Sequence, residues 1–352
     1  EDFPVLKVFT DVGDEDDDDD DDQGGGTQPE PEDNDGVMAG PNGETVWGGA
    51  SDLSAPVDSD GNGVYEISKA SELAYVIKNG GEGKKYKLTA DIYLNDTSKI
   101  NWKDGTVAAD YTVNSWYDSY GAAKFTGSIN GAGHTVYGIY YKGGNTSFQH
   151  YVPASIGLIP YVESNTSVEI TNLGVDGVYI WYECYASAFV GSVGTNGSPS
   201  NVVFENCYAG KYVNITAYSA SAFRGYTYDG ATVLKNSYSY GTYTNNGGAT
   251  GLIGAVWGPT DILNCYNTNG PIISDTVRYQ VTIKNSYQTV NGGAIDAEAY
   301  IISKANMKGQ DALINADKMS KLNEDSVYLA TDSYPVNYVF TDAYVDDGAS
   351  GN

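Results

Sequence analysis

The stretch Phe204-Glu205-Asn206-Cys207-Tyr208 returns several times, in varied form, along the middle of the chain. Its variants are Ile170-Thr171-Asn172-Leu173, Leu234-Lys235-Asn236-Ser237-Tyr238, Leu263-Asn264-Cys265-Tyr266 and Ile283-Lys284-Asn285-Ser286-Tyr287. The spacings between successive asparagines are 34, 30, 28 and 21 residues. Self-similarity at such a period indicates a solenoid, in which each repeat forms one coil that stacks on the next.

A second phrase, of the type Gly-apolar-apolar-Gly, falls between the copies of the first. Its examples are Gly157-Leu158-Ile159-Pro160, Ala188-Phe189-Val190-Gly191 and Gly251-Leu252-Ile253-Gly254. Equivalent residues of stacked coils lie above one another, so the apolar residues of both phrases should form an interior core. Asparagines at the turns can then form hydrogen-bonded ladders. The sequence predicts one ladder of Asn172, Asn206, Asn236, Asn264 and Asn285, and one of Tyr208, Tyr238, Tyr266 and Tyr287.

The charge balance of the chain disfavours two classes of partner. Its 352 residues include 46 acidic and 19 basic side chains, for a net charge of −27. Such a polyanion repels nucleic acid and anionic membrane surfaces. No apolar run approaches the roughly 20 residues that a spanning helix needs. We therefore expect no nucleic acid partner and no membrane insertion.

Three cysteines are too few for a disulfide framework. Cys207 and Cys265 occupy the same position of the repeat, and Ser237 and Ser286 occupy it in alternate copies. Neighbouring strands lie roughly 4.8 Å apart, so two coils separate these cysteines by about 10 Å. That distance exceeds the limit of about 7 Å for a disulfide, so the sequence predicts small buried residues stacked in a row.

Nearly the same phrase stands at the beginning and at the end of the chain. Residues 1–11 read EDFPVLKVFTD and residues 332–342 read DSYPVNYVFTD. Six positions are identical at an offset of 331: Pro4, Val5, Val8, Phe9, Thr10 and Asp11 match Pro335, Val336, Val339, Phe340, Thr341 and Asp342. Residues 1–12 therefore resemble the last strand of a preceding copy of the unit. The alternatives are a strand that docks on a neighbouring subunit through Phe3, Val5, Val8 and Phe9, and a chance likeness between two strands.

Acidic segments follow both copies of this phrase. Residues 13–45 contain seven consecutive aspartates, Asp16–Asp22, and little that is apolar, which predicts a flexible linker. Residues 346–352 form an acidic tail. Loose calcium binding on these carboxylates is the functional interpretation, and a solvated spacer is the simpler one.

A second calcium candidate is Asp58-Ser59-Asp60-Gly61-Asn62-Gly63, in which Asp58, Asp60 and Asn62 alternate as in a calcium loop. The twelfth position should carry a bidentate Glu and carries Lys69, so a turn into the next strand is the better interpretation. No cofactor is expected, and calcium alone stays open.

Between the linker and the tail, the sequence predicts a solenoid flanked by two caps. The solenoid covers residues 46–290 and begins with a helix over about 68–80, which Ser68 caps and Gly80 stops. A helix at this place can cover the open end of the first coil. Residues 291–345 are expected to close the opposite end, with short helices over 303–322 and a last strand over 334–344.

Residues 125–141, FTGSINGAGHTVYGIYY, predict a hairpin of two strands around the turn Asn130-Gly131. Together with YKLTADIYL at 86–94, IGLIPYV at 156–162 and the returning NCY phrases, this order resembles the GLUG-repeat surface proteins of bacteria. The resemblance covers about residues 55–340. It implies an all-β fold, a right-handed parallel β-helix (solenoid) with short capping helices at the ends. It also implies an extracellular location on the bacterial cell surface, and it supplies no catalytic residues.

Exposed aromatic residues are the candidates for ligand contact. Among the 31 tyrosines and 5 tryptophans of the chain, Trp181, Tyr182 and Trp257 stand outside the repeated phrase. Tyrosine and tryptophan offer flat apolar faces with a polar group, which suits contact with sugars or proteins. The tyrosines of the repeat are expected to be structural, because stacked aromatic pairs stabilise sheets.

These observations lead to three hypotheses of function. The first is a non-catalytic structural or adhesive module of a bacterial surface array or filament, which assembles with neighbouring copies of itself through its terminal strands. The second is a carbohydrate-binding adhesin that uses exposed aromatic residues. The third is a polysaccharide lyase or hydrolase, which needs clustered carboxylates with an Arg or Lys base. Arginine occurs only at Arg224 and Arg278, and acidic residues are scattered over the coils, so no enzyme is expected.

Overall fold

The computed structural model describes residues 36–116, 124–143, 155–163, 165–195, 197–273, 279–290, 299–324 and 326–341. Strands account for 43% of the structure and helices for 9%, so the predicted all-β class is confirmed. Residues 1–12, residues 13–35 of the predicted linker and the acidic tail lie outside the described residues.

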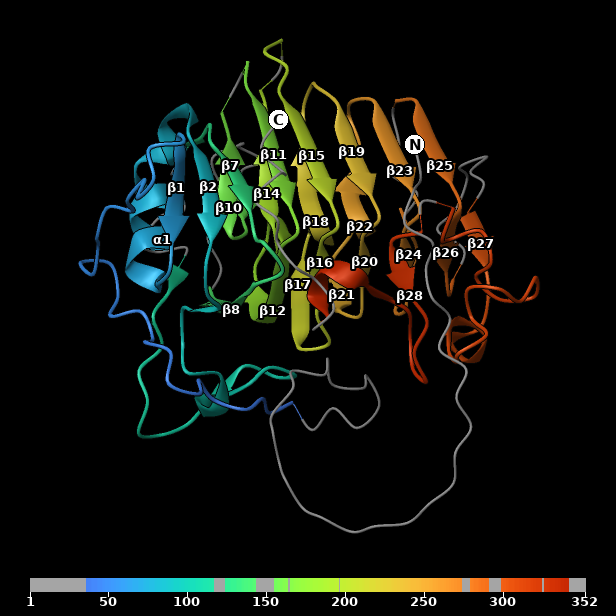
Figure 1. Cartoon of the computed structure of the whole chain (residues 1–352), viewed down its shortest axis with the longest axis horizontal. Helices are drawn as coiled ribbons and strands as arrows, with labels where there is room; N and C mark the ends of the chain where they lie inside the picture. Colours follow the sequence, from blue (N-terminus) through green and yellow to red (C-terminus); the bar gives the residue numbers. More distant parts are fainter. Residues whose placement is uncertain are drawn as a thin grey trace.

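Three parallel sheets run along the long axis of the molecule (Figure 1). The first contains β1 (Val64–Ile67), β2 (Lys85–Leu88), β7 (Ser128–Asn130), β11 (Ser167–Thr171), β15 (Asn201–Glu205), β19 (Thr232–Lys235), β23 (Thr260–Leu263) and β25 (Val281–Lys284). The second contains β3 (Ile92–Tyr93), β8 (Thr135–Lys142), β12 (Gly174–Trp181), β16 (Tyr208–Ala209), β17 (Val213–Ala217), β20 (Tyr238–Ser239), β21 (Thr242–Asn245), β24 (Tyr266–Asn267), β26 (Ser286–Gln288) and β27 (Ala299–Ile301). The third contains β6 (Lys124–Phe125), β9 (Ser155–Ile156), β10 (Ile159–Val162), β13 (Tyr185–Ser187), β14 (Val190–Val193), β18 (Ser219–Thr227) and β22 (Thr250–Ala255).

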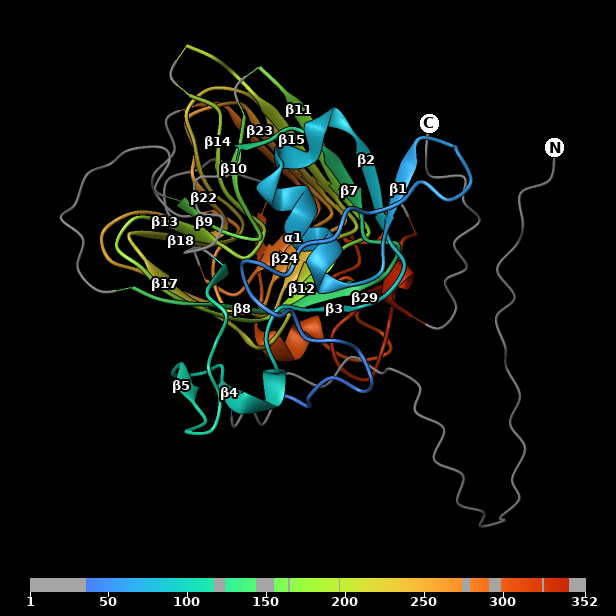
Figure 2. The same ribbon diagram turned by 90° about the vertical axis from the view of Figure 1, so that its left-hand side faces the viewer.

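Each coil of the chain adds strands to the three sheets before the next coil begins. Seen along the axis, successive coils overlie one another and curl around a common interior (Figure 2). The pairs within the three sheets are parallel, as in the pairing of β11 with β15 and of β15 with β19. This arrangement is consistent with an all-β parallel solenoid.

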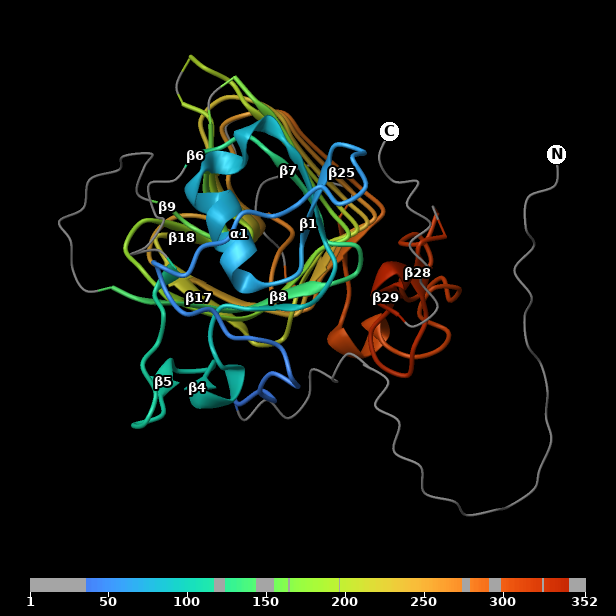
Figure 3. The same ribbon diagram turned by 60° about the vertical axis from the view of Figure 1, so that its left-hand side comes forward.

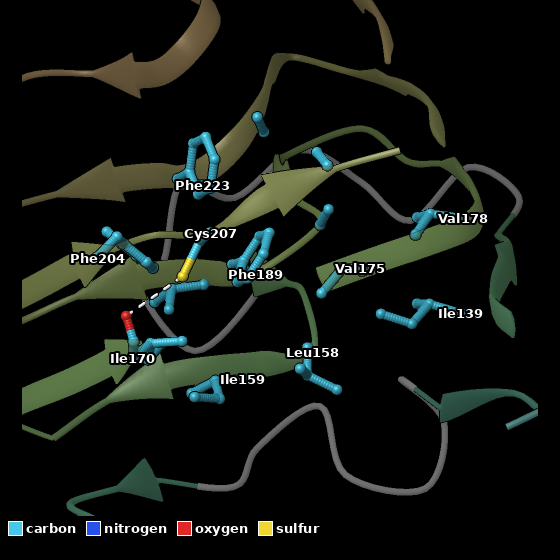
Figure 4. Packing of buried hydrophobic residues seen from close by; sticks show 14 of the residues in the cluster. Ile139, Leu158, Ile159, Ile170, Val175, Val178, Phe189, Phe204, Cys207 and Phe223 are labelled. Carbon is cyan, nitrogen blue, oxygen red and sulfur yellow. Dashed lines mark hydrogen bonds between the residues drawn. The ribbon is translucent and has the colours of Figure 1, made fainter. Parts of the chain in front are cut away.

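Apolar residues of the repeated phrase stack in register through the interior. Ile170 pairs with Phe204, Phe204 with Leu234, Leu234 with Ile262 and Ile262 with Ile283. All five are at most 5% exposed. Burial of a side chain of this size stabilises a fold by about 1.5–3 kcal/mol, so each coil gains stability chiefly from its neighbours. Figure 4 shows Ile170 and Phe204 in this core together with Phe189 and Phe223.

The predicted helix at the beginning of the solenoid is present as α1, which spans Ala70–Lys78. Its apolar side chains Leu73, Val76 and Ile77 are at most 1% exposed, and the helix lies over the end of the stack (Figure 2). Gly80, with φ 72°, follows the helix and begins the 3-10 helix η1 (Gly80–Gly83). The helix therefore covers the first coil as the sequence suggests.

The start of α1 differs in detail from the prediction. Lys69 is the N-cap residue and makes no side-chain cap bond. Glu72 instead accepts hydrogen bonds from Ser68 N at 2.8 Å and Ser68 Oγ at 3.1 Å. Ser68 thus donates to the first turn, whereas the sequence predicted that its hydroxyl would accept.

The hairpin predicted over residues 125–141 is wrong in its pairing. Strands β7 and β8 exist, but β7 pairs with β2 and β11, and β8 pairs with β3 and β12. Gly131 N donates to Thr171 O of the next coil at 2.7 Å. The Asn130-Gly131 turn is therefore a corner of a coil that leads the chain from the first sheet into the second.

The C-terminal region differs from the predicted cap in both structure and position. Residues 303–322 contain one 3-10 helix, η3 (Lys304–Met307), followed by turns. The predicted last strand is the short β29 (Val336–Asn337), which pairs antiparallel with β28 (Tyr328–Leu329) and runs into the 3-10 helix η4 (Tyr338–Phe340).

These elements lie beside the stack and not over its end (Figure 3). Met307, Met319 and Leu322 pack in a cluster with Tyr208 and Tyr287 on the side of the solenoid, separate from the interior core. Residues 303–341, as far as the structure describes them, therefore do not close the end of the core as predicted, because their apolar side chains bury against the tyrosine ladder. Only β27 of the predicted cap extends the last coil, with Ala299 against the interior core.

Part of the segment assigned to the linker packs against the body. Gly36 O accepts a hydrogen bond from Trp102 N at 2.6 Å, and Ala39 O accepts one from Thr97 Oγ1. Around this contact lie η2 (Thr97–Lys99) and the antiparallel pair β4 (Ile100–Asn101) and β5 (Thr106–Val107). No helix in the described ranges is long and apolar enough to cross a membrane.

Candidate functional site

The asparagines of the repeated phrase form the predicted ladder. All five have φ between 51° and 53°, a left-handed conformation that asparagine tolerates better than most residues. Four of the five Nδ2 groups donate to the Oδ1 atom of an asparagine in the preceding coil: Asn172 to Asn130 at 3.1 Å, Asn206 to Asn172 at 3.0 Å, Asn264 to Asn236 at 3.1 Å and Asn285 to Asn264 at 3.1 Å. Between Asn206 and Asn236 the ladder is interrupted, and Asn206 Oδ1 accepts from Asn337 Nδ2 instead. The ladder is thus confirmed except for the rung between Asn206 and Asn236, and Asn130 adds a first member that the sequence reading did not include.

The thiols and hydroxyls next to these asparagines also form hydrogen bonds within the stack of coils. Cys207 and Cys265 are buried and form no disulfide. Cys207 Sγ donates to Ile170 O at 3.4 Å (Figure 4), while Cys207 N donates to Ser237 Oγ at 3.0 Å. Burial raises the pKa of both thiols to about 12, so they stay protonated and unreactive at neutral pH. The prediction of small buried residues stacked in a row is confirmed.

The tyrosines of the repeat stack face to face. The rings of Tyr208 and Tyr238 are 5.6 Å apart at an interplanar angle of 11°, and those of Tyr238 and Tyr266 are 5.0 Å apart at 2°. Tyr287 pairs in register with Tyr266. Tyr208 lies over Gly174, where a Cβ atom would collide with its ring. The predicted structural role of these tyrosines is confirmed.

The asparagine and tyrosine ladders together form one side of the stack, which we call the ladder face. Residues 326–341, which we call the strap, cover it. Tyr328 Oη donates to Asn264 O at 2.8 Å, and Tyr266 Oη donates to Pro335 O. The ring of Phe340 contacts that of Tyr208 edge-on at 4.6 Å. Burial raises the pKa of Tyr266 well above its usual value, so its hydroxyl remains a donor.

Asn337 is the polar anchor of the strap. Its Nδ2 group donates to Asn206 Oδ1 at 3.0 Å and to Asn236 O at 3.2 Å, and its Oδ1 atom accepts from Val339 N at 3.2 Å. Asn337 is fully buried. The sequence reading missed this residue, although its place in a phrase that also ends in Val-Phe-Thr-Asp was a signal.

The three aromatic residues proposed for ligand contact do not share one surface. Trp181 is 39% exposed at the end of β12 in the second sheet. Tyr182, which follows it, is buried against Tyr141 with ring centroids 5.6 Å apart. Trp257 follows β22 in the third sheet and is half-buried.

Trp257 belongs to an aromatic group that the sequence reading missed. Its ring is 6.2 Å from that of Tyr226, which contacts Tyr185 at 4.2 Å and Tyr228 at 4.8 Å. Tyr185 and Tyr226 are buried, while Tyr228 and Trp257 are partly exposed. The members come from different positions of the repeat, so their meeting depends on the corner between β13 and β14.

The calcium candidate at residues 58–63 is built as a turn. Asp58 Oδ2 accepts from Gly63 N at 3.0 Å, Asp60 Oδ1 from Asn62 N at 3.1 Å and Asn62 Oδ1 from Val64 N at 2.8 Å. Within the described parts of the chain, no three His, Cys, Asp or Glu side chains gather as a metal site would require.

A buried carboxyl group and a buried guanidinium group lie in the middle coils. Asp176 on β12 accepts from Gly177 N at 2.8 Å and Tyr212 N at 2.9 Å, and burial raises its pKa to about 7. Arg224 on β18 is fully buried, and burial lowers its pKa to about 9. Its Nη1 group donates to Ala255 O at 3.1 Å, while Nε and Nη2 make no hydrogen bond. Its neighbours in the sheet are Val190 and Ile253, so the site does not pair it with a carboxylate there.

No family model, no curated protein and no solved structure matches this chain.

Proposed function

We propose that this chain is a non-catalytic structural module of a bacterial surface array or filament. In this proposal the coils form a right-handed parallel β-helix of the GLUG-repeat kind, and the module extends and spaces an extracellular assembly. The observation that carries it is the use of the recurring polar groups. The recurring amide, thiol and phenol groups bond to neighbouring coils or to the strap.

This use of the polar groups distinguishes a structural framework from a binding or catalytic site. A binding or catalytic surface presents its repeated polar groups to a ligand, where they remain accessible. Here Asn236, Cys265 and Tyr266 are at most 2% exposed, or fully buried, and the strap covers the tyrosines. Such contacts add stability coil by coil, which is what a long spacer requires.

A carbohydrate-binding adhesin is the second candidate, and one observation favours it. Trp181 is the exposed last residue of β12, and its indole ring is available for stacking on a sugar. Trp257 offers a second, smaller aromatic surface next to Tyr226.

Three measurements on the full chain test these candidates. Immunogold labelling of intact source cells should place the protein at the cell surface, and label that appears only after permeabilisation would contradict the proposal. On a glycan array the structural module should show no saturable binding. Saturable binding that Trp181→Ala abolishes and Trp257→Ala leaves unchanged would favour the adhesin. Release of reducing ends or unsaturated sugars from acidic polysaccharides would contradict both.

A further inference from the structure

The chain carries two copies of the strap phrase, whereas its described residues form one ladder face. The C-terminal copy, within residues 332–341, occupies that face. The N-terminal copy, within residues 1–10, matches it at an offset of 331. The chain thus contains one more strap than the face in the described structure can accept.

Three positions of the strap that are buried on the ladder face or contact it are shared by the two copies. Pro335 O accepts hydrogen bonds from Tyr266 Oη and, at 3.5 Å, from Tyr240 Oη. Val339 is 3% exposed, and Phe340 contacts the ring of Tyr208. The corresponding residues of the N-terminal copy are Pro4, Val8 and Phe9.

At two further positions, one aromatic and one exposed, the copies carry different residues that are both compatible with docking. Tyr334 is 3% exposed, with its ring 5.5 Å from that of Tyr240, and Phe3 keeps an aromatic ring at this position. Tyr338 is 40% exposed, and Lys7 replaces it with a charged side chain that an exposed position tolerates.

One buried position differs in chemistry. Asn337, which bonds to Asn206 Oδ1 and Asn236 O, corresponds to Leu6. A leucine cannot donate to these acceptors, and leaving buried acceptors without a donor is unfavourable. The N-terminal copy therefore fits the face of its own chain less well than the strap already there.

We infer that residues 3–10 are a second strap, which docks on the ladder face of another unit of this fold. Burial of Leu6 there requires that this unit offer an apolar contact where the present chain has the amide of Asn206. Residues 11–35, which are largely acidic, then connect this second strap to the solenoid of its own chain. This inference rests on the proposed function, because it identifies how neighbouring units of the array are joined.

A disulfide between β28 and β29 can report whether the strap is seated, because a two-stranded pair this short is not stable unless it packs on the ladder face. Leu329 and Val336 are antiparallel partners in β28 and β29, so Leu329→Cys with Val336→Cys should form a cross-link in the full chain. The three natural cysteines are buried and do not compete. In this background, Tyr334→Phe, Asn337→Leu and Tyr338→Lys together write the N-terminal phrase into the strap.

We expect the rewritten strap to cross-link as fully as the original one. Its melting temperature should fall by the same amount as that of the single variant Asn337→Leu. The matched control replaces the shared residues instead, with Val339→Asp and Phe340→Ala, and should lose the cross-link. A rewritten strap that fails to cross-link, while the single Asn337→Leu variant still does, would overturn the inference.

A second pair of cysteines tests which face receives residues 3–10. Val5 corresponds to Val336, so Val5→Cys with Leu329→Cys reports docking of the N-terminal copy. We expect no closed monomer with this pair, and a cross-linked closed monomer would place the segment on its own face and overturn the inference. Neither result bears on the structural-module proposal, which depends on the labelling and glycan experiments.

Discussion

The two ends of the stack differ in how the terminal coil is covered. The first coil is covered by α1, whose Leu73 and Ile77 are completely buried. At the other end, β25 and β27 are the last strands of the first and second sheets. Among the described residues near this end, exposed apolar side chains are Tyr279 at 49%, Val290 at 49%, Tyr300 at 41% and Ile301 at 54%.

The two ends differ in where the apolar side chains of the flanking segments are buried. A terminal edge strand offers unpaired backbone groups to other chains unless something covers it. The helix protects the first edge, whereas Met307, Met319 and Leu322 of the C-terminal region pack on the ladder face. We therefore expect the first end to determine stability and the last end to determine association.

The largest effect is expected at the helix. Ile77→Ala removes a completely buried side chain from the seal over the first coil and should lower the free energy of unfolding by about 2–5 kcal/mol. Lys78→Ala, at the neighbouring exposed position, should change it by less than about 0.5 kcal/mol. Urea denaturation monitored by circular dichroism measures both. Equal, small losses would show that the helix does not seal the end.

The second effect, on the pH dependence of stability, is expected at Asp176, which lies in the middle coils between the two ends. Burial raises the pKa of Asp176 from 3.8 to about 7, so the folded protein holds this proton where the unfolded chain has lost it. Because the folded state binds more protons between about pH 4 and pH 7, stability falls as pH rises through this window. Lys211 is the nearby cation, and Tyr208 stays neutral because its pKa is raised well above its usual value.

Asp176→Asn removes this proton linkage and can still accept from Gly177 N and Tyr212 N. The pKa is raised by about three units and each unit corresponds to about 1.4 kcal/mol, so we expect the variant to be more stable by about 4 kcal/mol at pH 8 and unchanged near pH 4. Thermal unfolding across this pH range provides the measurement. A gain that does not depend on pH would contradict the role of the carboxyl.

The smallest effect on stability, and the clearest one on association, is expected at the last coil. Ile301→Lys places a charge on the edge strand β27 and should change the free energy of unfolding by less than about 0.5 kcal/mol. Sedimentation velocity over a concentration series should show weaker self-association than in the wild type. Ile314→Lys is the matched control, because Ile314 is 81% exposed but lies outside the sheets. Loss of association in both variants alike would point to charge and not to the edge.

Sequence reasoning succeeded where the same residue returns at the same position of each coil. The asparagine ladder and the tyrosine stack followed from the phrase alone, because stacking in register brings equal residues together. The same logic placed Cys207 and Ser237 in one column, and Cys207 N does donate to Ser237 Oγ. Repetition thus replaces the long-range information that a single sequence otherwise lacks.

It failed where the partner lies outside the repeat. The strands around Asn130 and Gly131 were recognised, but their pairing was not, because a hairpin and a coil corner share the same local pattern. The strap appeared only as a last strand, since the bond between Asn337 and Asn206 joins residues 131 positions apart. The aromatic group around Tyr226 and Tyr185 depends on a corner that no local spacing predicts.

The left-handed asparagines also bear on how this protein ages chemically. Deamidation of asparagine begins when the next backbone nitrogen attacks the side-chain carbon. In the ladder, the nitrogen after Asn206 donates to Ser237 Oγ, and the nitrogen after Asn264 donates to Ser286 Oγ. The side-chain amides are held at the same time by the neighbouring coils. The bonds that join the coils therefore also keep these asparagines from the rearrangement that shortens the life of proteins that are not renewed.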